Sequence, residues 1–369
     1  MKIRYLYQQK KWPRFEWDQD RISNLLERVR LNQGRLIGKM EGLGFDLRDE
    51  AVLQNLTEDV IKSSEIEGEK LDRLQVRSSI ARRLGMDVAG LVRSDRDVEG
   101  VVEMATDAIQ NYNQLLTTKR LFDWHAALFP TGRSGMTQIN VGAWRDDASG
   151  PMQVISGPLG RTNVHFQAPK AQLLQSEMKL FLNWINKKKV TDSILKAAVA
   201  HLWFLTLHPF DDGNGRIARA ITDLLLARSE QSSKRFYSIS AQICAERKSY
   251  YEILEKTQKG SLDLTEWILW FLSCMEKALQ NADKVLSSVM KKAKFWENRS
   301  GESFSERQRK LLNRLLDGFE GNMTSSRWAS IGKCSQDSAT RDIQDLIRKN
   351  ILKRNPGGGR STSYSLLDA

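Results

Sequence analysis

Residues 208–219 of this 369-residue chain, HPFDDGNGRIAR, bring together an imidazole, two carboxylates, a Gly-Asn-Gly turn and two arginines. An imidazole has an unperturbed pKa of about 6.5, so His208 can accept the proton of a hydroxyl group at neutral pH as a general base. Asp212 offers one hard oxygen ligand, which suits an Mg²⁺ ion that is held mainly by substrate phosphates. These residue types predict a site for a phosphate-containing substrate.

The flanking sequence places this motif between two buried helices. Apolar residues recur at helical spacing on both sides, at Ile194, Leu195, Ala198, Val199, Leu202 and Leu205 before it and at Ile217, Ile221, Leu224 and Leu225 after it. The turn of Gly213, Asn214 and Gly215 is expected to bind an anion, because the first N–H groups of a helix lack partners and carry the positive end of its dipole. Arg216 and Arg219 oppose that dipole, which indicates a bound polyanion.

The motif resembles the signature of the Fic family, H-x-F-x-[D/E]-G-N-G-R-x-x-R, and matches it at every fixed position. Members of that family mostly transfer AMP from ATP to a Ser, Thr or Tyr hydroxyl of a protein and release pyrophosphate. The resemblance implies that His208 is the base, Phe210 the core anchor of the loop and Asp212 the Mg²⁺ ligand. It also implies two groups of phosphate-binding residues, Gly213, Asn214 and Gly215 for the α-phosphate and Arg216 and Arg219 for the β- and γ-phosphates.

Two other interpretations of the motif are disfavoured by its residues, and two further ones stay open. The dinucleotide fingerprint G-x-G-x-x-[G/A] must follow a strand, whereas a helical pattern precedes this turn. The Doc branch of the family replaces the second glycine by lysine and acts as a kinase, so Gly215 favours AMP transfer. Two alternatives stay open: a nucleic-acid-binding regulator with a nucleotide-sensing Fic domain, and a de-AMPylase or transferase of another phosphate-linked group that uses the same site.

A second motif lies upstream. Residues 63–68, SSEIEG, close an expected helix, with Gly68 as a C-cap and with Ser63 and Glu67 four apart on one face. The segment resembles the family's inhibitory motif, [S/T]-x-x-x-E-[G/N]. The resemblance implies that Glu67 pairs with Arg219 and blocks the seating of the γ-phosphate, since a carboxylate bound to the guanidinium places negative charge where the triphosphate must go. An ordinary helix end is the alternative interpretation.

A β-hairpin is expected between these motifs. Residues 152–156 and 162–166 alternate in polarity around a Gly-Pro-Leu-Gly turn. In the Fic family, a flap at this place in the chain order, after a Gly-x-Trp/Tyr-Arg-like element (here residues 142–145), docks the target by strand pairing. The resemblance therefore implies that residues 152–166 bind a protein target.

Some aromatic and histidine side chains have open roles. Tyr250 and Tyr251 resemble the adenine-side segment of the family, and packing in the core is the equal alternative. His165 and His201 are expected to be structural. Residues 5–17 resemble an N-terminal extension found in one group of bacterial Fic proteins, and we expect this segment to pack against the core.

The C-terminal part of the sequence predicts a separate domain. A polar stretch after Lys292, at residues 296–306, is interpreted as a linker. Beyond it, three amphipathic helices and two strands around a glycine-rich turn resemble the winged helix-turn-helix modules found at the ends of Fic proteins. The expected domains are a helical N-terminal region with the inhibitory motif (1–94), a Fic core (95–292) and the winged helix (301–369).

The winged helix has two possible partners, DNA or another protein. The candidate DNA contacts are Arg341, Arg348, Arg354 and Arg360 for phosphates and Gln336 and Ser338 for bases. Three acidic residues on the same helix, Asp337, Asp342 and Asp345, are expected to repel phosphate. Protein contact, including a homodimer, is the competing interpretation.

Composition limits the class of protein. A hydrophobic fraction of 40% with 28% charged residues describes a globular chain that can bury a core. A net charge of +12 favours polyanionic partners, although ATP binding and a solvated basic surface account for part of it. Three scattered cysteines and the absence of an apolar leader or long apolar run predict a cytoplasmic protein that does not cross a membrane. The expected fold is mainly α, a Fic-type helical core with a small β-hairpin flap and a C-terminal winged helix.

Overall fold

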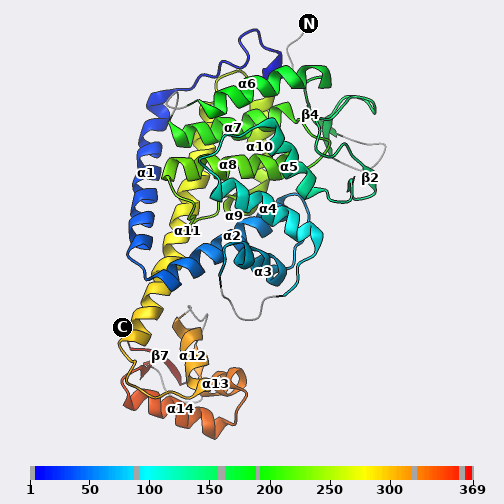
Figure 1. Ribbon diagram of the computed structural model, residues 1–369. Coiled ribbons are helices and arrows are strands. Elements are labelled where there is room, and N and C mark those ends of the chain that lie inside the picture. The colour runs from blue at the N-terminus through cyan, green and yellow to red at the C-terminus, as the bar shows by residue number, and fades with distance from the viewer. Residues whose placement is uncertain are drawn as a thin grey trace. The chain divides into compact units, whose positions relative to one another are not determined.

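The computed structural model describes residues 5–86, 92–156, 163–187, 192–316, 322–356 and 362–367. It is mainly helical, which confirms the predicted fold class (Figure 1). The chain divides into two compact units, Met1–Ala282 and Asp283–Ala369. None of the helices within the described ranges is both long and apolar enough to span a bilayer.

Helices dominate the N-terminal part of the first unit. They are η1 (Leu6–Gln8), α1 (Gln19–Glu41), α2 (Phe45–Ile66) and α3 (Arg73–Arg83). α1 buries one face, because residues at every third or fourth position from Ile22 to Met40 point inward, and all of these except Gln33 are apolar. α2 ends with Glu67 as its C-cap, and Gly68 follows at φ +88°, a left-handed conformation that glycine adopts without strain. The helix end predicted at residues 63–68 is therefore confirmed.

The motif lies between the two most buried helices of this unit. The remaining helices are α4 (Arg96–Gln110), α5 (Thr118–Leu128), η2 (Ala171–Leu173), α6 (Leu174–Asn186), α7 (Ser193–Leu207), α8 (Asn214–Glu230), α9 (Ile239–Ala245), α10 (Arg247–Gln258) and part of α11 (Thr265–Glu297). α7 packs against α8 and α6 (Figure 1). Nearly every residue of α7 and α8 is buried, as expected for helices enclosed by protein on all sides. Residues 208–213, the motif loop, join them as predicted.

Two small hairpins belong to this unit. The first pairs β1 (Arg133–Ser134) with β2 (Thr137–Gln138). The second pairs β3 (Gln153–Ser156) with β4 (Asn163–Gln167) in antiparallel register, with an irregularity after Val154. The two strands predicted for the flap are thus observed, and the turn predicted between them lies outside the described residues.

The N-terminal extension packs against the flap and against α7. The rings of Tyr5 and Tyr7 lie 5.0 and 6.1 Å from the ring of Phe166 on β4, and the Tyr7 hydroxyl donates to the Gln167 carbonyl at 3.0 Å. Farther along, Trp12 and Phe15 pack edge-on against Trp203, a buried residue of α7, with ring centroids 5.9 and 5.3 Å apart. The extension therefore supports the flap as well as the core.

The second unit contains the end of α11, three further helices and a three-stranded antiparallel sheet within the described residues. Its elements are α12 (Glu306–Leu316), β5 (Met323–Thr324), α13 (Ser325–Gly332), α14 (Gln336–Arg348), β6 (Leu352–Arg354) and β7 (Ser363–Leu366), with strand order β5-β7-β6. The predicted helices and strands are present, and β5 is an additional short strand. Trp328 is fully buried in the core of this unit with Leu311 and Leu346.

The boundary between the units differs from the predicted linker. α11 continues to Glu297, and the second unit begins at Asp283, inside that helix. The reason is Phe295, which is buried in the core of the second unit with Leu311 and Leu312 and extends the apolar pattern of the helix past Lys292.

Candidate active site

His208 ends α7 in an unusual backbone conformation. Its φ of 48° and ψ of 59° are left-handed, which costs a residue with a Cβ atom about 1 kcal/mol. Arg145, which is 2% exposed, supports this turn: its Nε donates to the His208 carbonyl at 2.8 Å and its backbone N–H to the Pro209 carbonyl at 2.9 Å. A third bond runs from its Nη2 to the Pro169 carbonyl at 2.6 Å. Arg145 therefore sets the path of the motif loop.

The imidazole of His208 is poised to accept a proton. Burial lowers its pKa to about 4, so the ring is neutral at pH 7. Its Nδ1 atom lies 3.3 Å from the Leu205 carbonyl, which favours the tautomer with a hydrogen on Nδ1. That tautomer leaves Nε2 as the acceptor, the arrangement that a general base requires.

Phe210 anchors the motif loop in the core. It is fully buried and stacks on the ring of His125, with centroids 4.2 Å apart. The side chain of Asn214 receives the Phe210 N–H at 3.0 Å and donates to the Phe210 carbonyl at 2.8 Å. The predicted anchor is confirmed. Asn214, in contrast, uses its side chain to fix the loop, so only its backbone N–H remains for an anion.

Gly213 and Gly215 leave space for neighbouring groups that a Cβ atom would otherwise exclude. Gly213 has φ +78°, and a Cβ atom there would lie 2.9 Å from the ring of Phe129. A Cβ atom on Gly215 would lie 2.1 Å from Oε1 of Glu67. The first turn of α8 can therefore receive a carboxylate at van der Waals distance, and the same space suits a phosphate oxygen.

Arg219 contacts the two residues expected from the upstream motif. Its Nη2 lies 2.8 Å from Oε1 of Glu67, and its Nε donates to the Ser63 hydroxyl at 2.8 Å. The side chain of Arg219 is 1% exposed. Burial alone would lower its pKa, but the Glu67 carboxylate outweighs that effect and raises the pKa above its ordinary value. The predicted Glu67–Arg219 pair is thus present.

A second carboxylate neutralises the other arginine of the motif. Arg216 is 4% exposed, and its Nη1 lies 2.6 Å from Oε2 of Glu69. The guanidinium also lies over the ring of Phe129, 5.1 Å from the centroid. Burial raises the pKa of Glu69, against the lowering effect of Arg216. Both motif arginines are therefore paired with carboxylates from the chain that links α2 to α3.

Asp212 is oriented by two hydrogen bonds. Its Oδ1 accepts from the Gly213 N–H at 2.6 Å, and its Oδ2 accepts from the hydroxyl of Ser134 on β1. The described residues contain no cluster of three or more His, Cys, Asp or Glu side chains that could bind a metal by themselves. A single oriented carboxylate nevertheless fits Mg²⁺, because that ion usually takes its other ligands from water and substrate phosphates.

The two tyrosines after the motif helix lie in different environments. Tyr250 is buried, and its hydroxyl is 2.9 Å from Nε2 of His201, whose Nδ1 is 2.9 Å from the Thr222 hydroxyl. Burial lowers the pKa of His201 to about 3, so this histidine is a neutral core residue, as expected. Tyr251 is 39% exposed and donates to the Ile66 carbonyl at 3.4 Å. Of the pair, Tyr251 has exposed surface that an adenine ring could contact, whereas Tyr250 belongs to the core.

The flap is attached to α10. Nδ1 of His165 on β4 lies 2.7 Å from Oε2 of Glu255, and its Nε2 lies 2.6 Å from the Ser156 hydroxyl on β3. The side chain of Ile155 is 54% exposed. Within the described residues the flap sheet has two strands only, so its outer edges present backbone groups that a third strand can pair with.

Sequence reasoning missed three residues that shape the site. Arg145 was noted only as part of a four-residue element, Ser134 not at all, and Glu69 lies two positions beyond the assigned glutamate. The acidic spacing Glu-x-Glu at 67 and 69 could have indicated a carboxylate partner for Arg216 as well as for Arg219. The roles of Arg145 and Ser134 depend on contacts across 63 and 78 positions of sequence, which no local pattern reveals.

Two family models match parts of the chain. Residues 115–226 match the Fic/DOC family, and residues 5–86 match a domain of unknown function, DUF4172. The first match contains α7, the motif loop and most of α8. The second contains α1, α2 and both carboxylates that contact the motif arginines.

Individual proteins are similar at low identity. A protein adenylyltransferase Fic of Aedes aegypti is 22% identical over 224 residues, 58% of this chain and 39% of that protein. The adenylyltransferase fic-1 of Caenorhabditis elegans is 33% identical over 81 residues, 21% of this chain and 16% of that protein. The chain therefore spans less than half of the length of these relatives.

Solved structures share the fold. A Fic family protein from Desulfovibrio desulfuricans G20 superimposes with a TM-score of 0.54 at 18% identity, covering 96% of this chain and 98% of that one. A Fic domain containing signaling protein from Bacteroides thetaiotaomicron gives a TM-score of 0.51 at 20% identity, covering 78% and 99%.

Proposed function

Because the chain carries a Fic domain, we propose that it is an autoinhibited protein adenylyltransferase, which transfers AMP from ATP to a Ser, Thr or Tyr hydroxyl of a target protein. One observation carries the proposal. A neutral imidazole, His208, and two buried arginines converge on one helix N-terminus, and internal carboxylates neutralise both arginines. Such a site is built for a triphosphate and is restrained in the resting chain.

The proposed reaction assigns each group one task. Nε2 of His208 takes the proton of the target hydroxyl, whose oxygen forms a bond to the α-phosphorus of ATP while the bond to the bridging α,β-oxygen breaks. The leaving pyrophosphate carries the negative charge, which Arg216 and Arg219 neutralise. Backbone N–H groups at Asn214 and Gly215, in the first turn of α8, bind the α-phosphate. A bound triphosphate also raises the pKa of His208, since nearby negative charge favours the imidazolium.

Mg²⁺ is the proposed metal. Asp212 would bind it, with Ser134 fixing the orientation of that carboxylate. When bound, the ion supplies charge neutralisation to the phosphates and helps to orient them.

The restraint is proposed to involve both glutamates. Glu67 occupies the guanidinium of Arg219, and Glu69 occupies that of Arg216. Both carboxylates lie where phosphate charge must enter, so they repel it and compete for its partners. Activation then requires that the segment linking α2 to α3 moves or loses its charge.

The flap is proposed to dock the target. Residues 152–156 and 163–166 offer strand edges and the exposed side chain of Ile155, which suits the addition of an extended segment. The contact between His165 and Glu255 fixes the flap to α10, and the aromatic residues of the N-terminal extension support its other face.

The test is transfer of label from ATP that carries the isotope on its α-phosphate, in the presence of Mg²⁺ and a cell lysate. The native chain, Glu67→Gly, and Glu67→Gly combined with His208→Ala are compared. We expect weak, strong and no labelling of protein, in that order. If all three folded chains bind ATP and none transfers label, the adenylyltransferase proposal is wrong, and removal of AMP from a modified target or nucleotide sensing takes its place.

A second function is proposed for the C-terminal unit, the binding of DNA through α14 of a winged helix. Two of the three aspartates expected to repel phosphate are neutralised internally. Asp342 is 8% exposed and accepts from Arg307 at 2.6 and 2.9 Å, and Asp345 lies 2.8 Å from Nζ of Lys349. Asp337 is exposed, and of the three it alone forms no ion pair with another of the described residues. The expectation that Asp342 and Asp345 repel phosphate is therefore revised, because Arg307 and Lys349 already neutralise their charges.

The candidate DNA contacts differ in availability. Arg341 is exposed, and Arg348 is exposed with Asp345 at 3.5 Å. Gln336 donates to the Ser325 hydroxyl at 2.7 Å, and Arg360 lies outside the described residues. A filter-binding titration with duplex DNA tests the proposal against protein contact: binding that Arg341→Ala weakens supports DNA, and no binding at low salt leaves a protein partner.

A further inference from the structure

A large groove on the first unit lies outside the candidate active site. It has a volume of about 1320 Å³ and lies between the N-terminal extension, the chain linking α4 to α5, and α6. We call it the basic groove and define it by six of its lining residues, Arg14, Leu115, Lys179, Leu180, Trp184 and Lys187. Its volume exceeds the ~300–1,000 Å³ of most small-molecule sites, which favours a polypeptide as the occupant.

Apolar side chains in the basic groove face solvent. Leu115 is 62% exposed and Leu180 is 50% exposed. The ring of Trp184 is partly exposed beside them, with Nζ of Lys196 at 5.4 Å from its centroid. Clustered exposed apolar groups rimmed by polar residues are typical of interaction sites, because their burial on binding is favourable.

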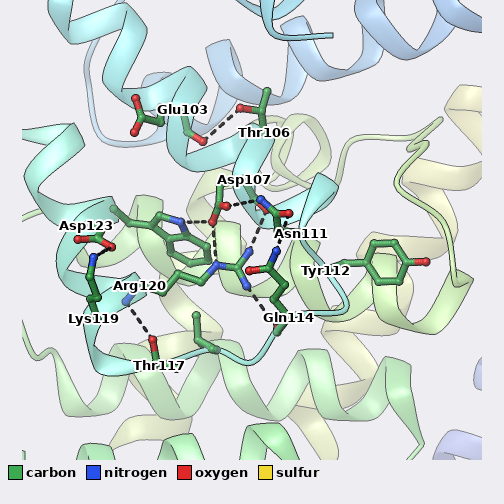
Figure 2. Close-up of polar contacts among 12 residues, drawn as sticks. Glu103, Thr106, Asp107, Asn111, Tyr112, Gln114, Thr117, Lys119, Arg120 and Asp123 are labelled. Carbon is green, nitrogen blue, oxygen red and sulfur yellow. Dashed lines mark hydrogen bonds and ion pairs between the residues drawn. The ribbon is translucent and has the colours of Figure 1, made fainter.

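The backbone that carries Leu115 is fixed before any partner binds. The adjacent network in Figure 2 holds the chain between α4 and α5: Nε of Arg120 lies 2.7 Å from Oδ2 of Asp107, and Nη2 of Arg120 donates to the Asp107 carbonyl at 2.9 Å. Arg228 donates to the Gln114 carbonyl at 2.6 Å, and Asn186 exchanges two hydrogen bonds with the backbone of Leu116. A preorganised anchor loses little entropy on binding.

The charge of the basic groove has one sign. Its charged lining residues are Arg14, Lys179 and Lys187, and none of the described residues that line it is a carboxylate. Glu177, also on α6, is not part of the lining and accepts from Nε1 of Trp12 at 3.0 Å. A ligand with negative charge is therefore complementary to the rim.

A neighbouring cleft shows the contrast. It has a volume of about 820 Å³, shares Leu115, and is lined by three cations and three carboxylates, Arg83, Lys119, Arg120, Glu103, Asp107 and Asp123. Figure 2 shows two pairs of these charges, Lys119 with Asp123 and Arg120 with Asp107, each at 2.7 Å. The third pair joins Arg83 and Glu103 at 3.2 Å. That cleft has no net preference for a charge, whereas the basic groove does.

We propose that the basic groove binds an acidic segment of a partner protein, with two apolar anchors of that segment packed on Leu115 and Leu180. A second copy of this chain is disfavoured as the occupant, since each copy carries a net charge of +12 and like charges repel. The proposal does not depend on the adenylyltransferase activity, because no defining residue of the groove belongs to the candidate active site.

The experiment selects binders from a random dodecapeptide display library with the full-length chain as bait. Enriched peptides are synthesised, labelled with fluorescein and titrated by anisotropy. We expect peptides with a net negative charge and spaced Leu, Ile or aromatic residues. Their Kd is expected to rise at least tenfold in Lys179→Glu/Lys187→Glu and in Leu115→Ala/Leu180→Ala.

Matched variants control for net charge and lost apolar surface. Lys248→Glu/Lys256→Glu makes the same charge change on exposed positions of α10, and Leu31→Ala/Leu74→Ala removes leucines that are 72% and 62% exposed. Both are expected to leave the Kd unchanged. In addition, a peptide with lysine in place of each acidic residue is expected to bind Lys179→Glu/Lys187→Glu better than the native chain.

Three results overturn the proposal. The first is an enriched set without acidic peptides, and the second is binding that both groove variants leave unchanged. The third comes from sedimentation of the native chain: a dimer that Leu115→Ala/Leu180→Ala dissociates would make a second copy the occupant. Circular dichroism of each variant confirms that a lost interaction is not lost folding.

Discussion

At the start of α8 and on the surface of α14, internal ion pairs neutralise charges that would otherwise act on a phosphate group, but the neutralised charges have opposite signs. On α8, two arginines that attract phosphate are neutralised by Glu67 and Glu69. On α14, the buried carboxylate of Asp342, which would repel phosphate, is neutralised by Arg307. The first region loses affinity for an anion through its internal pairs, and the second loses repulsion of one. The effect of a charged side chain on ligand affinity therefore depends on whether a residue of opposite charge in the same protein already neutralises it.

The two regions also differ in how the pairs can be broken. Glu67 and Glu69 come from a different segment of the first unit than the arginines do, and their side chains are 31% and 45% exposed. The side chain of Asp342 is only 10% exposed, and its Oδ2 accepts from Nε1 of the fully buried Trp328 at 3.2 Å. The pairs on α8 can therefore open without disrupting a core, whereas the pair on α14 is part of one.

The largest effect is expected from Glu67→Gly. This change frees a buried arginine for the triphosphate, and hydrogen bonds to charged groups are worth ~1.5–3 kcal/mol, so the rate of AMP transfer should rise roughly 10- to 100-fold. Initial rates of label incorporation measure it, with Leu31→Ala as an exposed control on α1. A rate equal to that of the native chain would remove Glu67 from the inhibitory model.

Arg307→Ala is expected to destabilise the second unit more than Asp342→Asn does. Removing the arginine leaves a buried carboxylate without its cation, which costs ~1–3 kcal/mol, whereas the arginine left by Asp342→Asn is 34% exposed and can be hydrated. Hydrogen exchange of the α14 amides in the full chain should accelerate correspondingly. Equal acceleration in the two variants would show that the carboxylate is not effectively buried.

Glu69→Gln is expected to have a smaller effect than Glu67→Gly. The Glu69 side chain is the more exposed of the two, and partly exposed pairs are worth ~0.2–1 kcal/mol, so ATP affinity should rise roughly two- to fivefold. Isothermal titration calorimetry with Mg²⁺-ATP measures the change. If ATP affinity, measured in the same way for both variants, rises more in Glu69→Gln than in Glu67→Gly, the ranking of the two carboxylates is reversed.

The smallest effect is expected on α14. If this helix contacts DNA, Asp337→Asn should strengthen binding roughly twofold, since an exposed like charge is worth ~0.5 kcal/mol, whereas Asp342→Asn should not, because Arg307 already neutralises that charge. Titration of duplex DNA at fixed salt compares the two. Equal gains would mean that the internal pair does not screen Asp342.

The local parts of the site could be predicted because they depend on short patterns. The buried helices on both sides of the motif loop, the anchoring of Phe210 and the C-terminal end of α2 follow from helical spacing and from the place of a glycine. The Glu67–Arg219 pair was accessible only through family resemblance, since it joins residues that no local rule connects. The linker predicted at residues 296–306 coincides with the stretch between α11 and α12, but the second unit begins earlier, at Asp283, because the polarity of neighbouring residues hid the burial of Phe295.

By itself, the sequence determined which chemical groups are available: one imidazole, a carboxylate beside it, a glycine turn and two arginines on a helix between apolar segments. Only the tertiary structure decided their state. Burial lowers the pKa of His208, Asn214 turns its side chain to the loop, Arg145 sets the backbone of that loop, and Glu69 occupies Arg216. The physical reason is that pKa, orientation and pairing depend on which distant residues come within a few ångströms, and packing of the whole unit sets those distances.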